Sequence, residues 1–84
     1  MSRYQVTYSS RAEAALASLA PAVRAQVKSQ ITGSVGNDPY GHGSAAAGRD
    51  KDLRDANIGA FVIIRYKITP SALVITVLRA VAPW

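Results

Sequence analysis

The second half of the chain contains Arg54, Arg65 and Arg79, of which the last two lie inside stretches otherwise rich in β-branched and aromatic residues. The guanidinium group is planar, holds two phosphate oxygens at once and does not lose its proton in proteins. A charged group inside such a stretch must reach solvent or meet a carboxylate, because an unpaired charge is costly to bury. The three arginines are therefore candidates for binding phosphate.

The charge of the whole chain favours an anionic partner as well. Ten Lys and Arg residues against five Asp and Glu residues give a formal net charge of +5 on 84 residues. Such an excess steers anions toward a protein and favours binding through the release of counterions. Nucleic acid and an acidic protein would both satisfy it. A structural ion-pair network is the alternative role for the arginines, since three carboxylates lie near them in the chain: Asp50, Asp52 and Asp55.

Few side chains can transfer a proton near neutral pH. His42 is the only one whose unperturbed pKa lies there. Tyr40 and Tyr66 are candidate acids, and Lys51 would serve if its pKa were lowered. Tyr66 and the histidine also have a plainer interpretation, because a tyrosine at strand spacing is typical of a half-buried core residue and a histidine between two glycines is typical of a solvated loop.

Length and composition predict one small globular domain over residues 1–84. The first residues alternate polar and apolar side chains, and no apolar run is long enough to cross a bilayer, so we expect neither a secretion signal nor a membrane span. The chain has no cysteine and one histidine. We therefore expect no disulfide, no metal ion and no other cofactor, in a cytoplasmic protein.

The first half of the chain is predicted to form a strand and two helices. Residues 3–8 alternate as a strand does. Ser10 and Glu13 have the spacing of a capping box, which predicts that a helix begins at Ser10. Pro21 ends that helix and suits the first turn of another. The second helix is predicted to bury four residues: Val23, Val27, Ile31 and Val35.

The second half is predicted to form a long surface loop followed by three strands. Residues 37–51 contain glycines and a proline, which favours a loop. Residues 52–58, 61–68 and 73–81 have strand patterns, with turns between them. The order is thus β-α-α-β-β-β. It predicts an α+β fold in which a helical hairpin packs on one face of a small, mostly antiparallel four-stranded sheet.

Strand alternation predicts where the cations of the central strand lie. One face carries the apolar residues Val62, Ile64, Tyr66 and Ile68. Arg65 and Lys67 then point away from the helices. The position of Arg79 depends on the turn before it: an even-numbered turn places Thr76 beside Arg65, whereas an odd one or a β-bulge aligns Arg79 with Arg65.

The element order resembles that of the RelE/ParE superfamily of bacterial toxins. The resemblance covers nearly the whole chain and rests on four stretches: RAEAALASL in the first helix, GRDKDLRDANIG, FVIIRYKI and VITVLRAV. It implies the toxin half of a type II toxin–antitoxin pair, held in a hetero-oligomer by its cognate antitoxin. RelE-like members are ribosome-dependent endonucleases that cut messenger RNA, and ParE-like members inhibit DNA gyrase.

The chain also departs from the family's pattern. Asp55, Asn57 and Val62 stand where basic residues are common, and Ala82, Pro83 and Trp84 stand where nucleases have an arginine and a tyrosine or histidine. Three functions therefore stay open. The chain is a RelE-like mRNA endonuclease, a ParE-like gyrase inhibitor, or an attenuated toxin that binds only its antitoxin.

Cutting RNA without a metal requires activation of the ribose 2′-hydroxyl, stabilisation of the charged phosphorus and protonation of the leaving oxygen. For this activity the resemblance implies catalytic roles for Arg54, Arg79, Arg65 and Tyr66, and the search for a proton-transfer group adds His42 to the expected catalytic set. The expected RNA-binding residues are Arg49, Lys51 and Lys67.

Overall fold

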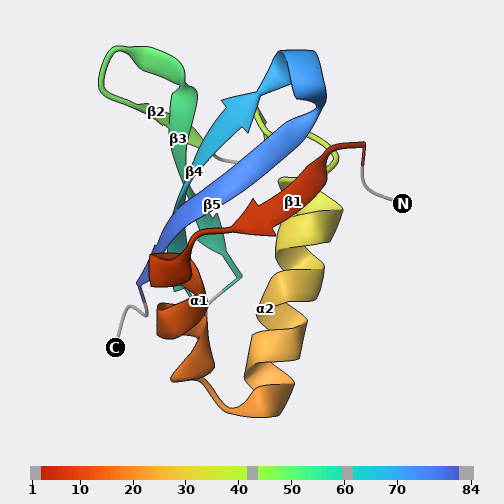
Figure 1. The fold of residues 1–84 in the computed structure, drawn as a ribbon, viewed down its shortest axis with the longest axis vertical. Coiled ribbons are helices and arrows are strands. Elements are labelled where there is room, and N and C mark those ends of the chain that lie inside the picture. The colour runs from red at the N-terminus through yellow and green to blue at the C-terminus, as the bar shows by residue number, and fades with distance from the viewer. Residues whose placement is uncertain (1–2, 42–43, 60–61, 82–84) are drawn as a thin grey trace.

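The computed structural model describes residues 3–41, 44–59 and 62–81. Two helices lie against one face of a five-stranded sheet (Figure 1). The helices are α1 (Ser10–Ala17) and α2 (Pro21–Ser34). The strands are β1 (Gln5–Tyr8), β2 (Ala45–Ala47), β3 (Asp50–Ile58), β4 (Val62–Thr69) and β5 (Val74–Val81), and a short 3₁₀ turn, η1 (Pro70–Ala72), joins β4 to β5. The predicted α+β class and helical hairpin are confirmed.

The sheet is mixed and has the order β1-β5-β4-β3-β2. β1 runs parallel to β5, and the other three pairings are antiparallel. The prediction of four strands is wrong by one, because β2 lies in the stretch predicted as a loop. β2 consists of three alanines. Alanine is a weak strand former, so the pattern of side chains gives no signal there, and β2 forms only by pairing with β3.

The N-cap of α1 is Ser9, one residue earlier than predicted. Its Oγ accepts a hydrogen bond from the Ala12 N–H at 3.1 Å and donates one to the Leu78 carbonyl at 2.8 Å. The predicted capping box is therefore wrong. The Glu13 carboxylate instead accepts a hydrogen bond from Lys28 Nζ at 2.9 Å, which ties α1 to α2. None of the helices in the described ranges is long and apolar enough to cross a membrane.

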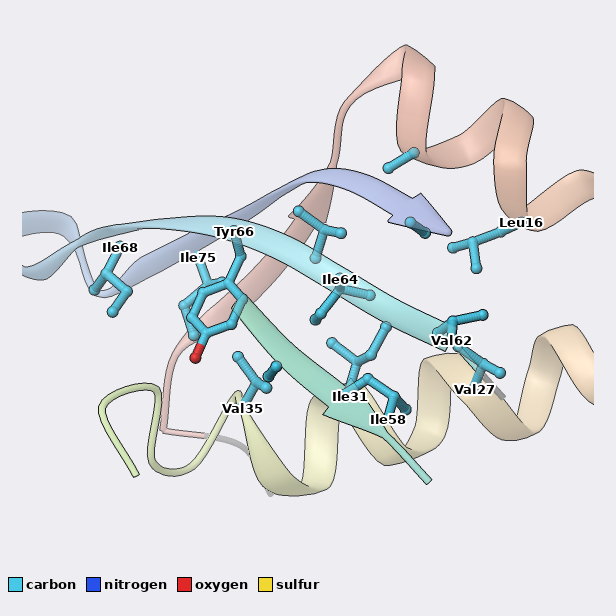
Figure 2. Packing of buried hydrophobic residues seen from close by; sticks show 14 residues of the cluster. Leu16, Val27, Ile31, Val35, Ile58, Val62, Ile64, Tyr66, Ile68 and Ile75 are labelled. Carbon is cyan, nitrogen blue, oxygen red and sulfur yellow. The ribbon is translucent and has the colours of Figure 1, made fainter. Parts of the chain in front are cut away.

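The core lies between the helices and the central strands. The predicted alternation of β4 is confirmed, because Val62, Ile64, Tyr66 and Ile68 are all buried, whereas Ile63 is 44% exposed. Figure 2 shows the four buried side chains in one cluster with residues of both helices. Of the four residues expected to be buried in the second helix, Val27, Ile31 and Val35 are buried, whereas Val23 is only partly buried. The burial of alternate residues in β4 thus identifies the face of the sheet that packs against the helices.

Truncating Ile64 should destabilise the protein far more than truncating its neighbour Ile63. Ile64 has no exposed surface, so Ile64→Ala leaves a cavity and should lower the free energy of unfolding by about 2–5 kcal/mol. Ile63→Ala is the matched control and should cost about 1 kcal/mol or less. Chemical denaturation of the two variants measures the difference. Equal losses would contradict the assignment of the two faces.

Candidate functional site

The register of β4 and β5 is interrupted beside Arg65. From Thr69 opposite Val74 to Tyr66 opposite Val77 the two strands pair residue for residue, and then Arg65 lies opposite Arg79. Leu78 is therefore the extra residue of a β-bulge. The bulge settles the question that the sequence left open, because it aligns Arg79 with Arg65. Thr76 lies opposite Lys67 instead.

Arg65, Lys67 and Arg79 lie on the sheet face opposite the helices, which we call the open face. Asp55 is the cross-strand partner of Arg65 on β3. Arg65 donates from Nε to Asp55 Oδ1 at 2.8 Å and from Nη2 to Oδ2 at 3.1 Å. These hydrogen bonds hold the pKa of Asp55 below its usual value, and the charge of Arg79 acts in the same direction. The single carboxylate of Asp55 therefore forms hydrogen bonds with Arg65 and interacts electrostatically with Arg79.

The remaining cations of the open face differ in their partners. Lys67 donates to an Asp50 oxygen, and this hydrogen bond lowers the pKa of Asp50. Arg79 is exposed and has no hydrogen-bond or ion-pair partner among the described residues. A shallow hollow of about 190 Å³ adjoins the Arg65–Asp55 pair, with Asn57 and Ile63 in its lining. Within the described ranges, the open face thus combines one arginine that lacks a partner with two cations that carboxylates neutralise.

Arg54 lies on the other face of the sheet, opposite Tyr66. Its guanidinium contacts the segment before β2: Nε donates to Ser44 Oγ at 2.9 Å, and Nη2 donates to the carbonyls of Ser44 at 3.1 Å and Tyr40 at 3.3 Å. Nη1 donates to the Lys51 carbonyl at 3.3 Å, and the group lies 5.6 Å from the centre of the Tyr40 ring. The structure therefore does not bring Arg54 together with Arg65 and Arg79.

The candidate proton donors lie near Arg54 rather than on the open face. Tyr66 is buried and its hydroxyl donates to the Pro39 carbonyl at 2.6 Å. Burial raises the pKa of Tyr66. The Tyr40 hydroxyl donates to Asp52 Oδ1 at 2.7 Å, and this hydrogen bond raises the pKa of Tyr40 to about 12. Both phenols therefore stay protonated at neutral pH. His42 lies outside the described residues.

Two further predicted RNA-binding residues lie around the start of β3, one in the strand and one just before it. Lys51 is an exposed residue of that strand, and Arg49 is exposed in the turn that leads into it. Gly48 allows this turn, because its φ of 81° lies in a region that favours glycine. The sequence analysis did not identify the role of Ser44, which is the principal hydrogen-bond partner of Arg54. A serine in a glycine-containing stretch carries no signal of such a contact.

The structure also contains an apolar groove of about 250 Å³. It runs between α1 and the ends of β4 and β5, and Leu16, Leu19, Val62 and Val81 are in its lining. Val81 is 48% exposed there. The sequence analysis did not predict this groove, because its lining comes from elements that are far apart in the chain.

Solved structures with a similar fold come from toxin–antitoxin systems. A chain of the RelBE2 complex from Mycobacterium tuberculosis has a TM-score of 0.82 and 20% identity, over 98% of this chain and 93% of that one. The archaeal RelE–RelB complex from Pyrococcus horikoshii contains a chain with a TM-score of 0.71 and 20% identity, over 95% and 94%. The isolated E. coli RelE toxin has a TM-score of 0.74 and 18% identity, over 94% of this chain and 83% of its own.

The protein has the RelE fold. The fold expected from the sequence resemblance is therefore confirmed, with the mixed five-stranded sheet as the correction. No protein-family model matches the chain. No curated protein sequence matches it either.

In this RelE fold, we predict that the Arg54 side chain stabilises the segment before β2, whereas the Arg65 side chain does not. Arg54→Ala removes every guanidinium contact to Ser44 and Tyr40, so we expect a loss of about 1–3 kcal/mol in the free energy of unfolding. Amide exchange of Gly41 and Ser44, whose N–H groups donate to the carbonyls of Asp38 and Gly41, should become faster.

Arg65→Ala is the matched control for the Arg54 variant. It breaks a half-exposed ion pair and should cost about 1 kcal/mol or less, with no change in the exchange of Gly41 and Ser44. Denaturation and NMR-detected exchange measure both effects. Unchanged exchange in Arg54→Ala would show that its contacts do not order this segment.

Proposed function

We propose that the protein is the toxin of a type II toxin–antitoxin pair and acts as a RelE-like ribosome-dependent endonuclease on messenger RNA. The observation that carries the proposal is the fold, which matches the isolated E. coli RelE toxin over 94% of the chain. The open face supports it, because Arg65 and Arg79 lie side by side on neighbouring strands. Two guanidinium groups in that arrangement suit the oxygens of one phosphodiester.

Arg65 and Arg79 would stabilise the charge that develops on phosphorus during cleavage. Arginine suits this task because it stays charged and its donors are fixed in one plane. Lys67, Lys51 and Arg49 would bind neighbouring phosphates along the RNA. The fixed donors supply the electrostatic part of the reaction and leave the proton transfers to other groups.

His42 is the candidate for proton transfer, because histidine is the side chain whose unperturbed pKa lies near neutral pH. Arg54 would act as a positioning residue, since it binds the carbonyls of Tyr40 and Ser44 on either side of His42 in the chain. Tyr66 would serve in proton transfer only after its hydroxyl leaves the Pro39 carbonyl. These assignments separate a binding task on the open face from a proton-transfer task near Arg54.

A cognate antitoxin is the partner that we infer, in a hetero-oligomer located in the cytoplasm. Two of the similar structures are complexes: the RelBE2 complex from Mycobacterium tuberculosis and the RelE–RelB complex from Pyrococcus horikoshii. The net charge of +5 favours an antitoxin with an acidic binding segment.

An attenuated toxin is the second candidate, and the ion pairs favour it. Asp55 and Asp50 neutralise Arg65 and Lys67, so Arg79 is the one cation of this trio without a partner among the described residues. Such a protein would bind its antitoxin through the same fold without cutting RNA.

Cleavage of messenger RNA on programmed ribosomes tests the proposed activity. Arg79→Ala should lower the single-turnover rate by roughly 100- to 1,000-fold, because it removes a positioned donor to the transition state. Arg11→Ala is the matched control, since Arg11 is an exposed residue of α1 and carries the same charge. Its rate should equal that of the wild type.

The other outcomes identify the other functions. Inhibition of supercoiling by DNA gyrase without RNA cleavage would indicate a ParE-like toxin. Binding of the antitoxin with neither activity would indicate an attenuated one. Equal rates for Arg79→Ala and the wild type would remove Arg79 from the catalytic set.

A further inference from the structure

The Arg65–Asp55 pair uses the same donors that a phosphate would use. Nε and Nη2 of Arg65 each donate to a different oxygen of the Asp55 carboxylate. Two parallel hydrogen bonds from one edge of a guanidinium are also the geometry in which arginine binds phosphate. A phosphate can take this edge of Arg65 only when the carboxylate has left it.

Asp55 also acts on the neighbouring arginine. Arg79 lies opposite Arg65, and its charge contributes to the low pKa of Asp55, so the carboxylate is within electrostatic reach of both arginines. A negative charge at this position repels an approaching phosphate at the same place where the two arginines attract it. Asp55 therefore opposes anion binding in two ways, by occupying Arg65 and by repulsion.

The fold does not need this ion pair. The side chains of Arg65 and Asp55 are 36% and 39% exposed. Ion pairs exposed to this degree contribute little to stability, since solvent screens them and two side chains must be held in one geometry. A ligand can break the pair at small cost.

We propose that Asp55 is an internal competitor for phosphate at Arg65, so that RNA binds the open face by displacing this carboxylate. The inference rests on the proposed function, because it concerns the same phosphate-binding surface. Arg79 is the first contact, since it is exposed and unpaired among the described residues. Arg65 joins only when the ligand displaces Asp55, which weakens the binding of single phosphates and favours ligands that offer several.

The chain offers a matched pair of variants for the test. Asp55→Asn removes the competing charge while keeping the size of the side chain. Asp52→Asn removes the same charge from the same strand, but the carboxylate of Asp52 accepts a hydrogen bond from the Tyr40 hydroxyl rather than from a cation. The probe is a short, labelled single-stranded RNA oligonucleotide, and its affinity is measured by fluorescence anisotropy over a range of salt concentrations.

Asp55→Asn should bind the oligonucleotide about 2- to 5-fold more tightly than Asp52→Asn, the range expected for removal of one exposed charge pair. Its log–log salt dependence should become steeper by up to about 0.7, because Arg65 can contact phosphate in every bound molecule, whereas in the wild type it does so only where Asp55 has been displaced. Asp52→Asn should leave the slope unchanged. Thermal melts verify that all variants are folded.

The Arg65→Ala background decides whether the gain comes through Arg65. If Asp55 competes for that guanidinium, the gain of Asp55→Asn over Asp52→Asn should be smaller in this background, because only the repulsion of phosphate by the carboxylate remains to be relieved. A gain of undiminished size there, or equal affinities of the two Asn variants in the wild-type background, would overturn the proposal. Both results are independent of cleavage on ribosomes, so failure of the inference is distinguishable from failure of the proposed activity.

Discussion

One extra residue in β5 determines which face of the sheet Arg79 occupies. Without the bulge at Leu78, strand alternation would place Arg79 on the same face as Ile75 and Val77, which pack against the helices. With it, the alternation restarts, so Ala80 is buried and Arg79 lies beside Arg65. The core keeps its apolar character and two arginines meet on the open face, both as consequences of a single inserted position.

Ser9 links this bulge to the start of α1. Its backbone N–H donates to the Val77 carbonyl at 2.9 Å, and its Oγ donates to the Leu78 carbonyl at 2.8 Å. The same Oγ accepts the Ala12 N–H as the cap of the helix. A bulge disrupts the ladder of hydrogen bonds and leaves carbonyl groups in need of donors. One serine therefore satisfies the irregular backbone of β5 and the first turn of α1 together.

The sequence was sufficient where a pattern was local and strongly periodic. The alternation in β4 predicted its buried face, and Pro21 predicted the first turn of α2. The pattern failed for β2, because three alanines have neither alternation nor strand propensity, and their pairing depends on β3. Strand order and the face of Arg54 were also beyond reach, since they depend on which residues meet after folding.

The residue types of the candidate site could be predicted from the sequence. Which of these residues lie close together in the fold could not. Arg65 and Arg79 do meet, but the bulge that aligns them leaves no mark in the sequence around Leu78. Arg54 shares their chemistry and lies across the sheet, where backbone carbonyls rather than a carboxylate satisfy it. A one-residue change of register reverses the face of a side chain, so sites assembled from strands are especially hard to derive from spacing alone.

The parallel pairing of β1 with β5 has a consequence for timing during synthesis. Gln5 pairs with Val74 and Tyr8 with Val77, contacts that join distant parts of the chain. Such contacts close large loops and form late. On the ribosome, β1 leaves the exit tunnel long before β5, and it has no strand partner until β5 follows. Arg79 belongs to that late strand, so its pairing with Arg65 forms only after β5 has been made and has joined β4.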